Sequence, residues 1–365
     1  MNAFRPTRVT VDLDAVRHNV RTLKPDGVEL MAVVNANGYG HGDVAVARAA
    51  IEAGATWLGV ALVEEGLALR MAGVEVPILV LSEAPDGAEA VALAHRLTPT
   101  LYTADGLRRF ASAARGRVGV HIKIDSGMHR VGIWPPEDAA GYAQDVVRAG
   151  LEVEGIFTHL AKSEDDEVTT KLQLERFGAA VDGIRAARID PRYVHAANSA
   201  AVIRHPETHL DLVRTGIAIY GVLPAPGVGD ELGLRPAMTW RSAVASTKRL
   251  EAGERLSYGH RYELERPAWV ATVPLGYADG YPRRAWASAD VLVGGRRRRI
   301  AGTVTMDQMI LDCGDDPPAT GDEVVVLGGQ GDERITAWEL ADHAGTVGYE
   351  IVTRVGPRVP REYRG

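Results

Sequence analysis

The chain has 365 residues, a formal net charge of −7, 46% hydrophobic residues and a single cysteine, Cys313. This length suits two domains with sizeable cores, and the acidic balance argues against a nucleic-acid or anionic-membrane partner. A lone cysteine excludes a disulfide framework, and neither a signal peptide nor a bilayer-spanning run is evident, so we expect a cytoplasmic protein.

Strands and helices alternate over the first two thirds of the chain. An opening strand at 8–13 precedes a helix that Asp14 is expected to cap, with Val16, Val20 and Leu23 on one face. Eight further strands then alternate with helices, which predicts a (β/α)8 barrel. The alternative, a doubly wound open sheet, usually has fewer strands and a Gly-x-Gly-x-x-Gly turn that is absent here. The predicted barrel strands are Glu29–Val34, Trp57–Leu62, Pro77–Leu81, Thr98–Tyr102, Val118–Ile124, Leu151–Thr158, Tyr193–Ala197 and Leu212–Ile219, and the helical patterns between them include Asp43–Ala53, Val63–Ala72, Ala104–Ala114, Pro136–Ala149 and Thr169–Ala186.

The pattern changes to short strands and close turns from Thr239 onward. We therefore expect the barrel at 1–235 and a mainly-β domain at 236–365, which the opening strand 8–13 joins. The basic run Arg296–Arg299 is interpreted as a hairpin turn with solvated arginines. The expected strands of this domain are Ala243–Leu250, Trp269–Pro274, Asp290–Val293, Arg299–Thr305, Met309–Asp312 and Glu323–Leu327.

Polar residues gather at the carboxyl ends of the predicted barrel strands, where barrel enzymes place their chemistry. The loops after the last two strands often hold phosphate, so Ser199 and the amides of Gly216 and Ile217 are candidate phosphate ligands. The other residues at these ends are Asn35 and Tyr39 after the first barrel strand, His159 closing the sixth, and Arg214 within the eighth.

Each of these residues also has a purely structural interpretation. Ser199 could be a helix N-cap, and His159 could be a hydrogen-bonded core histidine. Arg214 lies in an apolar strand, so it requires either a salt-bridge partner or a ligand. Lys123, in the apolar stretch 121–124, must be paired, deprotonated or modified if it is buried.

Motifs in both halves of the chain resemble those of the alanine racemases, pyridoxal-phosphate (PLP) enzymes that interconvert L- and D-alanine. The stretches that carry the resemblance are VVNANGYGHG, HIKIDSGMHRVGI, GIFTHLA, HAANSAA, LVRTGIAIYG, LSYGHRY, PLGYADGYPR, GTVTMDQM and GTVGYEIVTR. The resemblance implies a barrel plus a mainly-β domain, a head-to-tail homodimer, D-alanine supply for peptidoglycan, and no metal.

The resemblance also implies roles for individual residues. Arg214 would face the pyridine nitrogen, which weakens the ring as an electron sink and favours racemisation over side reactions. Tyr277 would be the catalytic base on the L face, acting in the partner's site. Arg130 would meet the substrate carboxylate, and Lys123 would be carbamylated to orient it. The remaining implied contacts are Tyr39, His159, Asn198, Ser199, Gly216, Ile217 and Tyr349 to the cofactor, and Met306 and Tyr258 to the substrate.

One departure affects the mechanism directly: Asn35 stands where the family has the lysine that forms a Schiff base with PLP. A carboxamide is not basic near neutral pH and cannot form that link. Three explanations remain open: a racemase whose lysine was substituted, a homologue that binds PLP or a PLP–amino acid adduct without turnover, or replacement by another lysine such as Lys162. A two-domain PLP decarboxylase is a further alternative, although the β-domain motifs resemble the racemases instead.

Overall fold

The computed structural model describes residues 4–365 and divides into two compact units. Unit 2 comprises Val16–Gly38 and Asp43–Arg235, and unit 1 comprises the N-terminal residues up to Ala15, Tyr39–Gly42 and Pro236–Gly365. Within the described range, none of the helices combines the length and apolar character that a bilayer crossing requires.

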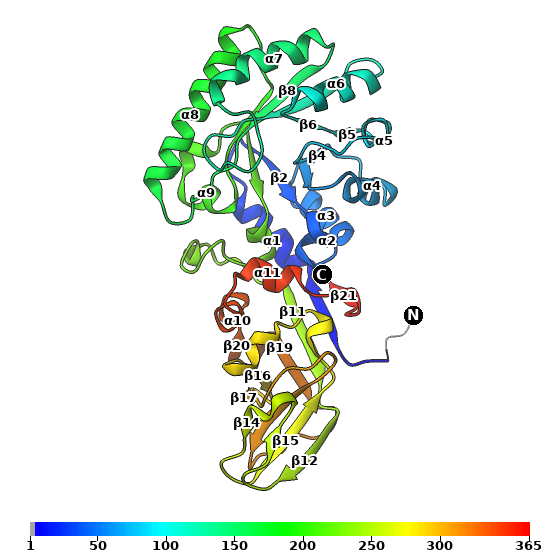
Figure 1. Ribbon diagram of the computed structural model, residues 1–365, viewed down its shortest axis with the longest axis vertical. Helices are drawn as coiled ribbons and strands as arrows, with labels where there is room; N and C mark the ends of the chain where they lie inside the picture. Colours follow the sequence, from blue (N-terminus) through cyan, green and yellow to red (C-terminus); the bar gives the residue numbers. More distant parts are fainter. Residues whose placement is uncertain (1–3) are drawn as a thin grey trace. The chain divides into compact units, whose positions relative to one another are not determined.

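Unit 2 is a closed barrel of parallel strands with helices on its outside, as Figure 1 shows. Two parallel sheets, β10-β2-β3-β4-β5 and β6-β7-β8-β9, make up its wall. The amides of Asp211 and Arg214 donate to the carbonyls of Val194 and Ala197, which joins β9 to β10 and closes the ring. Its strands are β2 (Glu29–Val33), β3 (Trp57–Val60), β4 (Ile78–Val80), β5 (Leu97–Thr98), β6 (Thr100–Leu101), β7 (Gly119–Lys123), β8 (Glu152–Phe157), β9 (Tyr193–His195) and β10 (Leu212–Thr215).

The short strands β5 and β6 are one barrel position interrupted at Pro99. Proline has no N–H to donate, but its carbonyl still accepts from the amide of His121. With β5 and β6 counted together, the described residues supply eight strand positions, and the predicted (β/α)8 barrel is confirmed.

The helices of unit 2 follow the strands at the intervals that the sequence predicts. The buried side chains of Val16, Val20 and Leu23 confirm the apolar face of the first helix. The cap, however, is Asp12, whose carboxylate accepts from the amide of Ala15, so the expectation for Asp14 was wrong. The helices are α1 (Leu13–Leu23), α2 (Asn35–Tyr39), α3 (Asp43–Glu52), α4 (Val63–Met71), α5 (Glu89–Ala94), α6 (Ala104–Ala113), α7 (Ala139–Arg148), α8 (Glu167–Ala186) and α9 (Ser199–Arg204), with short 3-10 turns at η1 (Pro136–Asp138), η2 (Pro206–Thr208), η3 (Ile217–Tyr220) and η4 (Asp230–Leu232).

Large side chains on the inward faces of the strands fill the barrel. The buried cluster takes one residue from each of six strands, so the interior is a packed core rather than a channel. Its members are Met31, Trp57, Leu79, Phe157, Tyr193 and Leu212.

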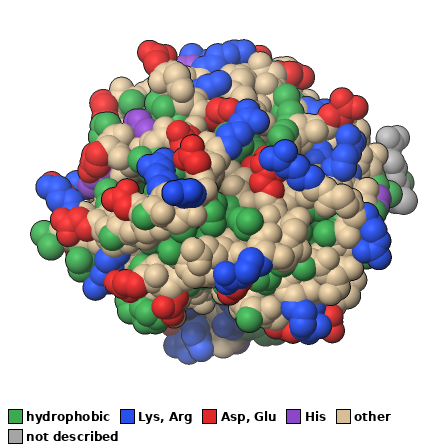
Figure 2. Space-filling view, turned by 90° about the horizontal axis from the view of Figure 1, so that it is seen from above, with side chains coloured by type: hydrophobic (Ala, Val, Ile, Leu, Met, Phe, Trp, Pro, Cys, Tyr) green, Lys and Arg blue, Asp and Glu red, His purple; other side chains and the backbone are tan. Residues whose placement is uncertain are grey.

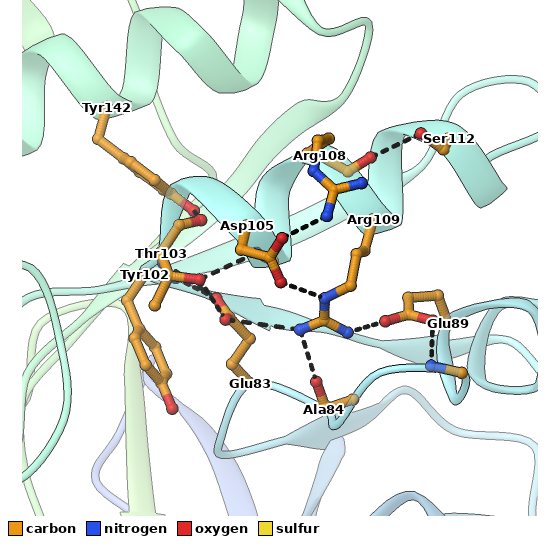
Figure 3. A network of polar contacts seen from close by, with 12 residues as sticks. Glu83, Ala84, Glu89, Tyr102, Thr103, Asp105, Arg108, Arg109, Ser112 and Tyr142 are labelled. Atoms are coloured by element: carbon orange, nitrogen blue, oxygen red, sulfur yellow. Dashed lines mark hydrogen bonds and ion pairs between the residues drawn. The ribbon is translucent and has the colours of Figure 1, made fainter.

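A buried ion-pair network around Arg109 joins α6 to the first residue of α5 and to the segment before that helix (Figure 3). The guanidinium pairs with Glu89 and lies 3.8 Å from Glu83, while all three side chains are largely buried. Glu83 also accepts from the amides of Tyr102 and Thr103 at 2.9 and 3.0 Å. The network therefore supplies hydrogen bonds and a counter-charge to two carboxylates that are largely shielded from water.

We expect Arg109→Leu to lower the free energy of unfolding by about 3–5 kcal/mol, because it leaves these carboxylates buried without a cation. Chemical unfolding followed by circular dichroism measures the change. Arg108→Ala is the matched control, since Arg108 and its partner Asp105 are both exposed and such pairs contribute about 0–1 kcal/mol. Equal losses in the two variants would contradict the prediction.

Unit 1 is mainly an antiparallel sheet of order β12-β15-β18-β17-β16-β19-β11-β1-β21, with β20 beside β19. The opening strand β1 (Arg8–Asp12) pairs antiparallel with β11 and parallel with β21. The other elements are β11 (Met238–Ala243), β12 (Ser246–Leu250), β13 (Arg255–Leu256), β14 (Tyr262–Glu263), β15 (Ala268–Val273), β16 (Asp290–Val293), β17 (Arg296–Ile300), β18 (Met309–Gly314), β19 (Glu323–Gln330), β20 (Glu333–Ile335), β21 (Arg361–Arg364), α10 (Ala337–Ala344), α11 (Gly348–Thr353), and the turns η5 (Tyr258–His260), η6 (Tyr277–Asp279) and η7 (Arg283–Ala287).

Three expectations for unit 1 were wrong in detail. The stretch 243–250 is not one strand, because the chain leaves β11 after Ala243 and begins β12 at Ser246. The hairpin expected at the arginine run 296–299 is present, since β16 pairs antiparallel with β17, but its turn lies at Gly294 and Gly295, with φ of 63° and 71°, and the arginines form β17 itself. The strand expected at 299–305 accordingly ends at Ile300.

Three of the four arginines of β17 pair with acidic groups, and the fourth, Arg299, donates to the backbone carbonyls of Ala287 and Ser288. Arg298 bonds the carbonyl of Cys313 and pairs with Asp316, and Arg297 pairs with Glu333 and Glu339. On the face seen in Figure 2, lysine and arginine side chains likewise lie among acidic ones.

Candidate functional site

A left-handed turn follows the first barrel strand and begins at Asn35. Ala36, Asn37 and Gly38 have φ near 51–58° and ψ near 47–49°, and Tyr39 also has a positive φ of 49°. Non-glycine residues rarely adopt this conformation, so the turn must be held from outside. Glu65 helps to hold it by accepting from the amide of Ala36 at 2.6 Å. The sequence predicted a glycine-released loop here but not its handedness.

Arg214 on β10 is buried in the barrel, with 4% of its surface exposed. Its guanidinium donates to the carbonyls of Thr158 and Ala196 at 2.8 and 3.0 Å and to Nδ1 of His195 at 3.1 Å, and lies 3.4 Å from Nδ1 of His159. All of these are neutral acceptors, and no acidic partner for Arg214 occurs in the described part of the chain. Burial lowers the pKa of Arg214 to about 9. Of the two partners expected for Arg214, a salt bridge is therefore absent from residues 4–365, and the other, a ligand, stays a prediction; such a site favours an anion.

Two histidines extend this network into the barrel. Because a guanidinium only donates, Nδ1 of His195 accepts, which leaves its Nε2 protonated to donate to Nδ1 of His121 at 2.9 Å. Burial, with Arg214 next, depresses the pKa values of both rings, that of His121 to about 3. Both imidazoles are therefore neutral near pH 7. His195 was not among the predicted site residues, although a histidine in an apolar strand ahead of Asn198 was a visible signal.

Ser199 lies beside the turn that follows β10. Its Oγ accepts from the amides of Gly216 at 3.0 Å and Ala218 at 3.4 Å. Ser199 is not the N-cap of α9, because the side chain of Asn198 accepts from Ala201 and takes that role. The strand was expected to continue through Gly216 and Ile217, but β10 ends at Thr215 and Ile217 begins η3. This turn directs backbone N–H groups toward the serine rather than into the sheet.

Lys123, at the end of β7, is 5% exposed, and its Nζ lies 5.0 Å from the ring centre of Phe157. Burial above all, together with the nearby charges of Arg214 and Arg130 and against the opposing effect of Asp125, lowers its pKa to about 7. A substantial fraction of Lys123 is thus a neutral amine at neutral pH. Arg130 itself is exposed in the loop after β7.

The depressed pKa of Lys123 predicts a pH dependence of stability. An unfolded lysine keeps a value near 10.5, so between pH 7 and 10.5 the unfolded chain binds more protons. The free energy of unfolding should therefore rise with pH across this range in carbonate-free buffer, and Lys123→Met should flatten the rise. Unfolding curves at several pH values measure it, and identical slopes for the two proteins would contradict the prediction.

The other predicted site residues belong to unit 1. Tyr39 and Tyr349 are neighbours, with ring centres 6.5 Å apart, and burial raises the pKa of Tyr39 to about 12. The amides of Tyr277 and Ala278 donate to the carbonyls of Thr305 and Met306, so Tyr277 and Met306 lie on adjoining segments. Tyr258 lies on a third, since its carbonyl accepts from Thr303.

Lys162, the lysine considered as a replacement anchor for PLP, lies in an exposed loop. Lys162 is 49% exposed and its Nζ lies 3.3 Å from Asp165 in the same loop. It is a solvated, ion-paired side chain, as its position after His159 suggested.

Fold and site together define the class: a (β/α)8 barrel with a mainly-β second domain, carrying buried cationic and amide donors at the carboxyl ends of its strands. Two family models match the chain, "Alanine racemase, N-terminal domain" over residues 11–224 and "Alanine racemase, C-terminal domain" over residues 237–363. The chain belongs to the alanine racemase family, whose members are PLP-dependent isomerases.

Individual relatives match along the whole chain. The alanine racemase of Symbiobacterium thermophilum is 49% identical, with 100% of this chain and 99% of the relative covered. The crystal structure of alanine racemase from D-cycloserine-producing Streptomyces lavendulae has a TM-score of 0.96 at 42% identity, covering 100% of this chain and 98% of that one. The Bacillus anthracis alanine racemase with bound L-Ala-P has a TM-score of 0.94 at 37% identity, covering 100% and 96%.

Proposed function

We propose that this chain is an alanine racemase-type protein that binds PLP and alanine, and that Asn35 leaves it impaired or inactive as a catalyst. In its active form the scaffold would interconvert L- and D-alanine and supply D-alanine for peptidoglycan. A second candidate, a homologue that holds PLP or a PLP–amino acid adduct without turnover, is favoured by one observation: the residue that begins the turn after the first barrel strand, Asn35, carries an amide.

The observation that carries the proposal is the buried cation of Arg214 beside the Ser199–Gly216 contact. A guanidinium bonded only to neutral acceptors is poorly compensated unless an anion or an electron-rich ring nitrogen joins it. Ser199 Oγ accepts from the amides of Gly216 and Ala218, so its own hydroxyl proton is left to donate to a phosphate. These residues fit the phosphate and the ring of PLP. Asn35 does not fit a covalent anchor, so we derive no catalytic step through a link at position 35.

When bound, PLP would act as an electron sink that makes the α-proton of an amino acid acidic. Arg214 would face the ring nitrogen and, as a donor only, would keep it unprotonated. Ser199, Gly216 and Ile217 would hold the phosphate. Tyr277 would exchange the α-proton at its phenolic oxygen on the L face, and Arg130 would bind the carboxylate.

We further propose that the protein works as a head-to-tail homodimer in the cytoplasm. Met306, Tyr258 and Tyr277 are 53%, 74% and 37% exposed in the single chain, which is unusual for side chains proposed to line a pocket. A partner barrel covering them would explain their exposure. The single cysteine, Cys313, is buried and fits a reducing compartment.

Borohydride reduction followed by peptide mass mapping tests the proposal. We expect PLP to remain with the protein through gel filtration but to label no lysine, Lys123 and Lys162 included. The Asn35→Lys chain is the matched control and should carry the label at position 35. A phosphopyridoxyl group on Lys162 would instead support a replacement anchor, and failure of the chain to retain PLP would overturn the proposed cofactor site.

A further inference from the structure

Asp279 closes the turn that carries Tyr277, and its side chain is completely buried. One carboxylate oxygen, Oδ2, accepts from the amide of Gly276 at 3.0 Å and from Arg5 at 2.8 Å. The other, Oδ1, accepts from the second guanidinium nitrogen of Arg5 at 2.9 Å. The pair is thus bidentate, which is the stiffest geometry of an ion pair.

Arg5 reaches this turn from the N-terminal segment and also fastens the end of β15. Its Nη2 donates to the carbonyl of Pro274 at 2.7 Å, and Thr7 donates to the same carbonyl at 2.8 Å. The N-terminal segment therefore holds both the strand that leads into the turn and the carboxylate within it.

The same carboxylate is tied to two further segments. Arg358, beyond α11, lies 3.5 Å from Asp279 and donates to Asp307 at 2.7 Å, next to Met306. The backbone adds to this, because the amide of Gly356 donates to the carbonyl of Asp279 at 2.9 Å. Asp279 is therefore the common partner of the N-terminus, the segment around Met306 and the segment after α11.

Two glycines show how closely these segments approach. A Cβ at Gly276 would lie 2.3 Å from the carbonyl oxygen of Met306, and one at Gly280 would lie 2.1 Å from that of Arg354. Both distances are impossible for a real side chain. The turn fits its position only because glycines flank it.

We propose that Arg5, Asp279 and Arg358 form a positioning network that fixes Tyr277 and Met306 through their backbone. Tyr277 is 37% exposed in the single chain, so contacts within the chain pack its ring only in part. The position of the ring therefore depends on the turn that carries it, and a buried carboxylate with two arginine partners makes that turn rigid. The inference rests on the proposed function, in which Tyr277 exchanges a proton.

Hydrogen exchange of the full chain, as it stands, tests the network without any catalytic assay. In Arg5→Ala we expect amide exchange at 276–280, 305–308 and 354–358 to accelerate together, by about tenfold or more, with partial rescue in Arg5→Lys. Arg8→Ala is the matched control, because Arg8 lies in the same segment but forms an exposed pair with Glu362. Faster exchange confined to the N-terminal segment would overturn the network. Asp279→Asn, which keeps the shape and removes the charge, gives a second test with the same expected pattern.

The link to proton transfer is tested in the Asn35→Lys chain. With Tyr277 misplaced, we expect kcat/KM to fall about 10- to 100-fold, and the primary isotope effect for α-deuterated L-alanine to rise while that for α-deuterated D-alanine falls. Altered exchange with unchanged isotope effects would overturn the positioning role. An inactive Asn35→Lys chain would refute the proposed function instead, while the exchange experiment would still decide whether the network exists.

Discussion

Replacing Asn35 with lysine is expected to raise the rate of L- to D-alanine interconversion by at least about 10²–10⁴-fold. Under the proposed function, a lysine at this position would supply both a basic group and an amine able to anchor PLP covalently. The surrounding residues need no change, because Arg214, Ser199 and Gly216 are already in contact with their partners. Chiral chromatography of alanine incubated with each protein and PLP measures the gain.

Asn35→Gln is the matched control for this experiment. It lengthens the side chain toward that of lysine but keeps a non-basic amide, so it should stay as slow as the chain with Asn35. A comparable gain in Asn35→Gln would show that reach, not basicity, limits the reaction. No gain in Asn35→Lys, despite retained PLP, would favour the homologue that binds without turnover.

Removing the hydroxyl of Tyr277 is expected to lower the rate of racemisation by about as much as the Asn35→Lys substitution raises it. In the Asn35→Lys chain, Tyr277→Phe should lower kcat by about 10²–10⁴-fold, because a positioned acid–base group is lost while its ring remains. Deuterium incorporation from solvent separates the two faces of the α-carbon. With D-alanine as substrate, deuterium should still enter the α-carbon, because the base on the D face remains. With L-alanine as substrate, loss of the α-proton should be slower, because the base on the L face is gone.

The same substitution in the chain with Asn35 shows whether folding is affected. Tyr277 is partly exposed and no hydrogen bond of its hydroxyl contributes to the turn described here, so thermal stability should change little. A large loss of stability would mean that the hydroxyl supports the fold. An unchanged kcat would remove Tyr277 from the proposed proton transfer.

The barrel could be predicted from sequence because its strands are short apolar stretches at regular intervals, such as Glu29–Val33 and Leu212–Thr215. Periodicity locates such a stretch but not its ends. Pro99 divided one strand, and the chain left the eighth strand before Gly216. Helices α10 and α11 escaped prediction because they are only eight and six residues long. Local pattern is weak in elements that tertiary packing stabilises.

The predicted site residues fall into two groups for a physical reason. Arg214 was identifiable because a charge in an apolar strand needs a partner wherever the fold places it. Asp279 was not, since its importance lies in a partner far along the chain, Arg5, which is 274 positions away. Asn198 and Ser199 are adjacent and both are residue types that cap helices, so the sequence could not decide between them. The backbone geometry decides, and Asn198 is the cap.

The left-handed turn at Ala36–Tyr39 has a consequence for substitutions at position 35. Such a backbone costs about 1–2 kcal/mol for each non-glycine residue, and the cost is the same whichever side chain precedes it. The backbone conformation that orients residue 35 is therefore already built into the chain. A lysine placed there by a single substitution would need no rearrangement of the main chain.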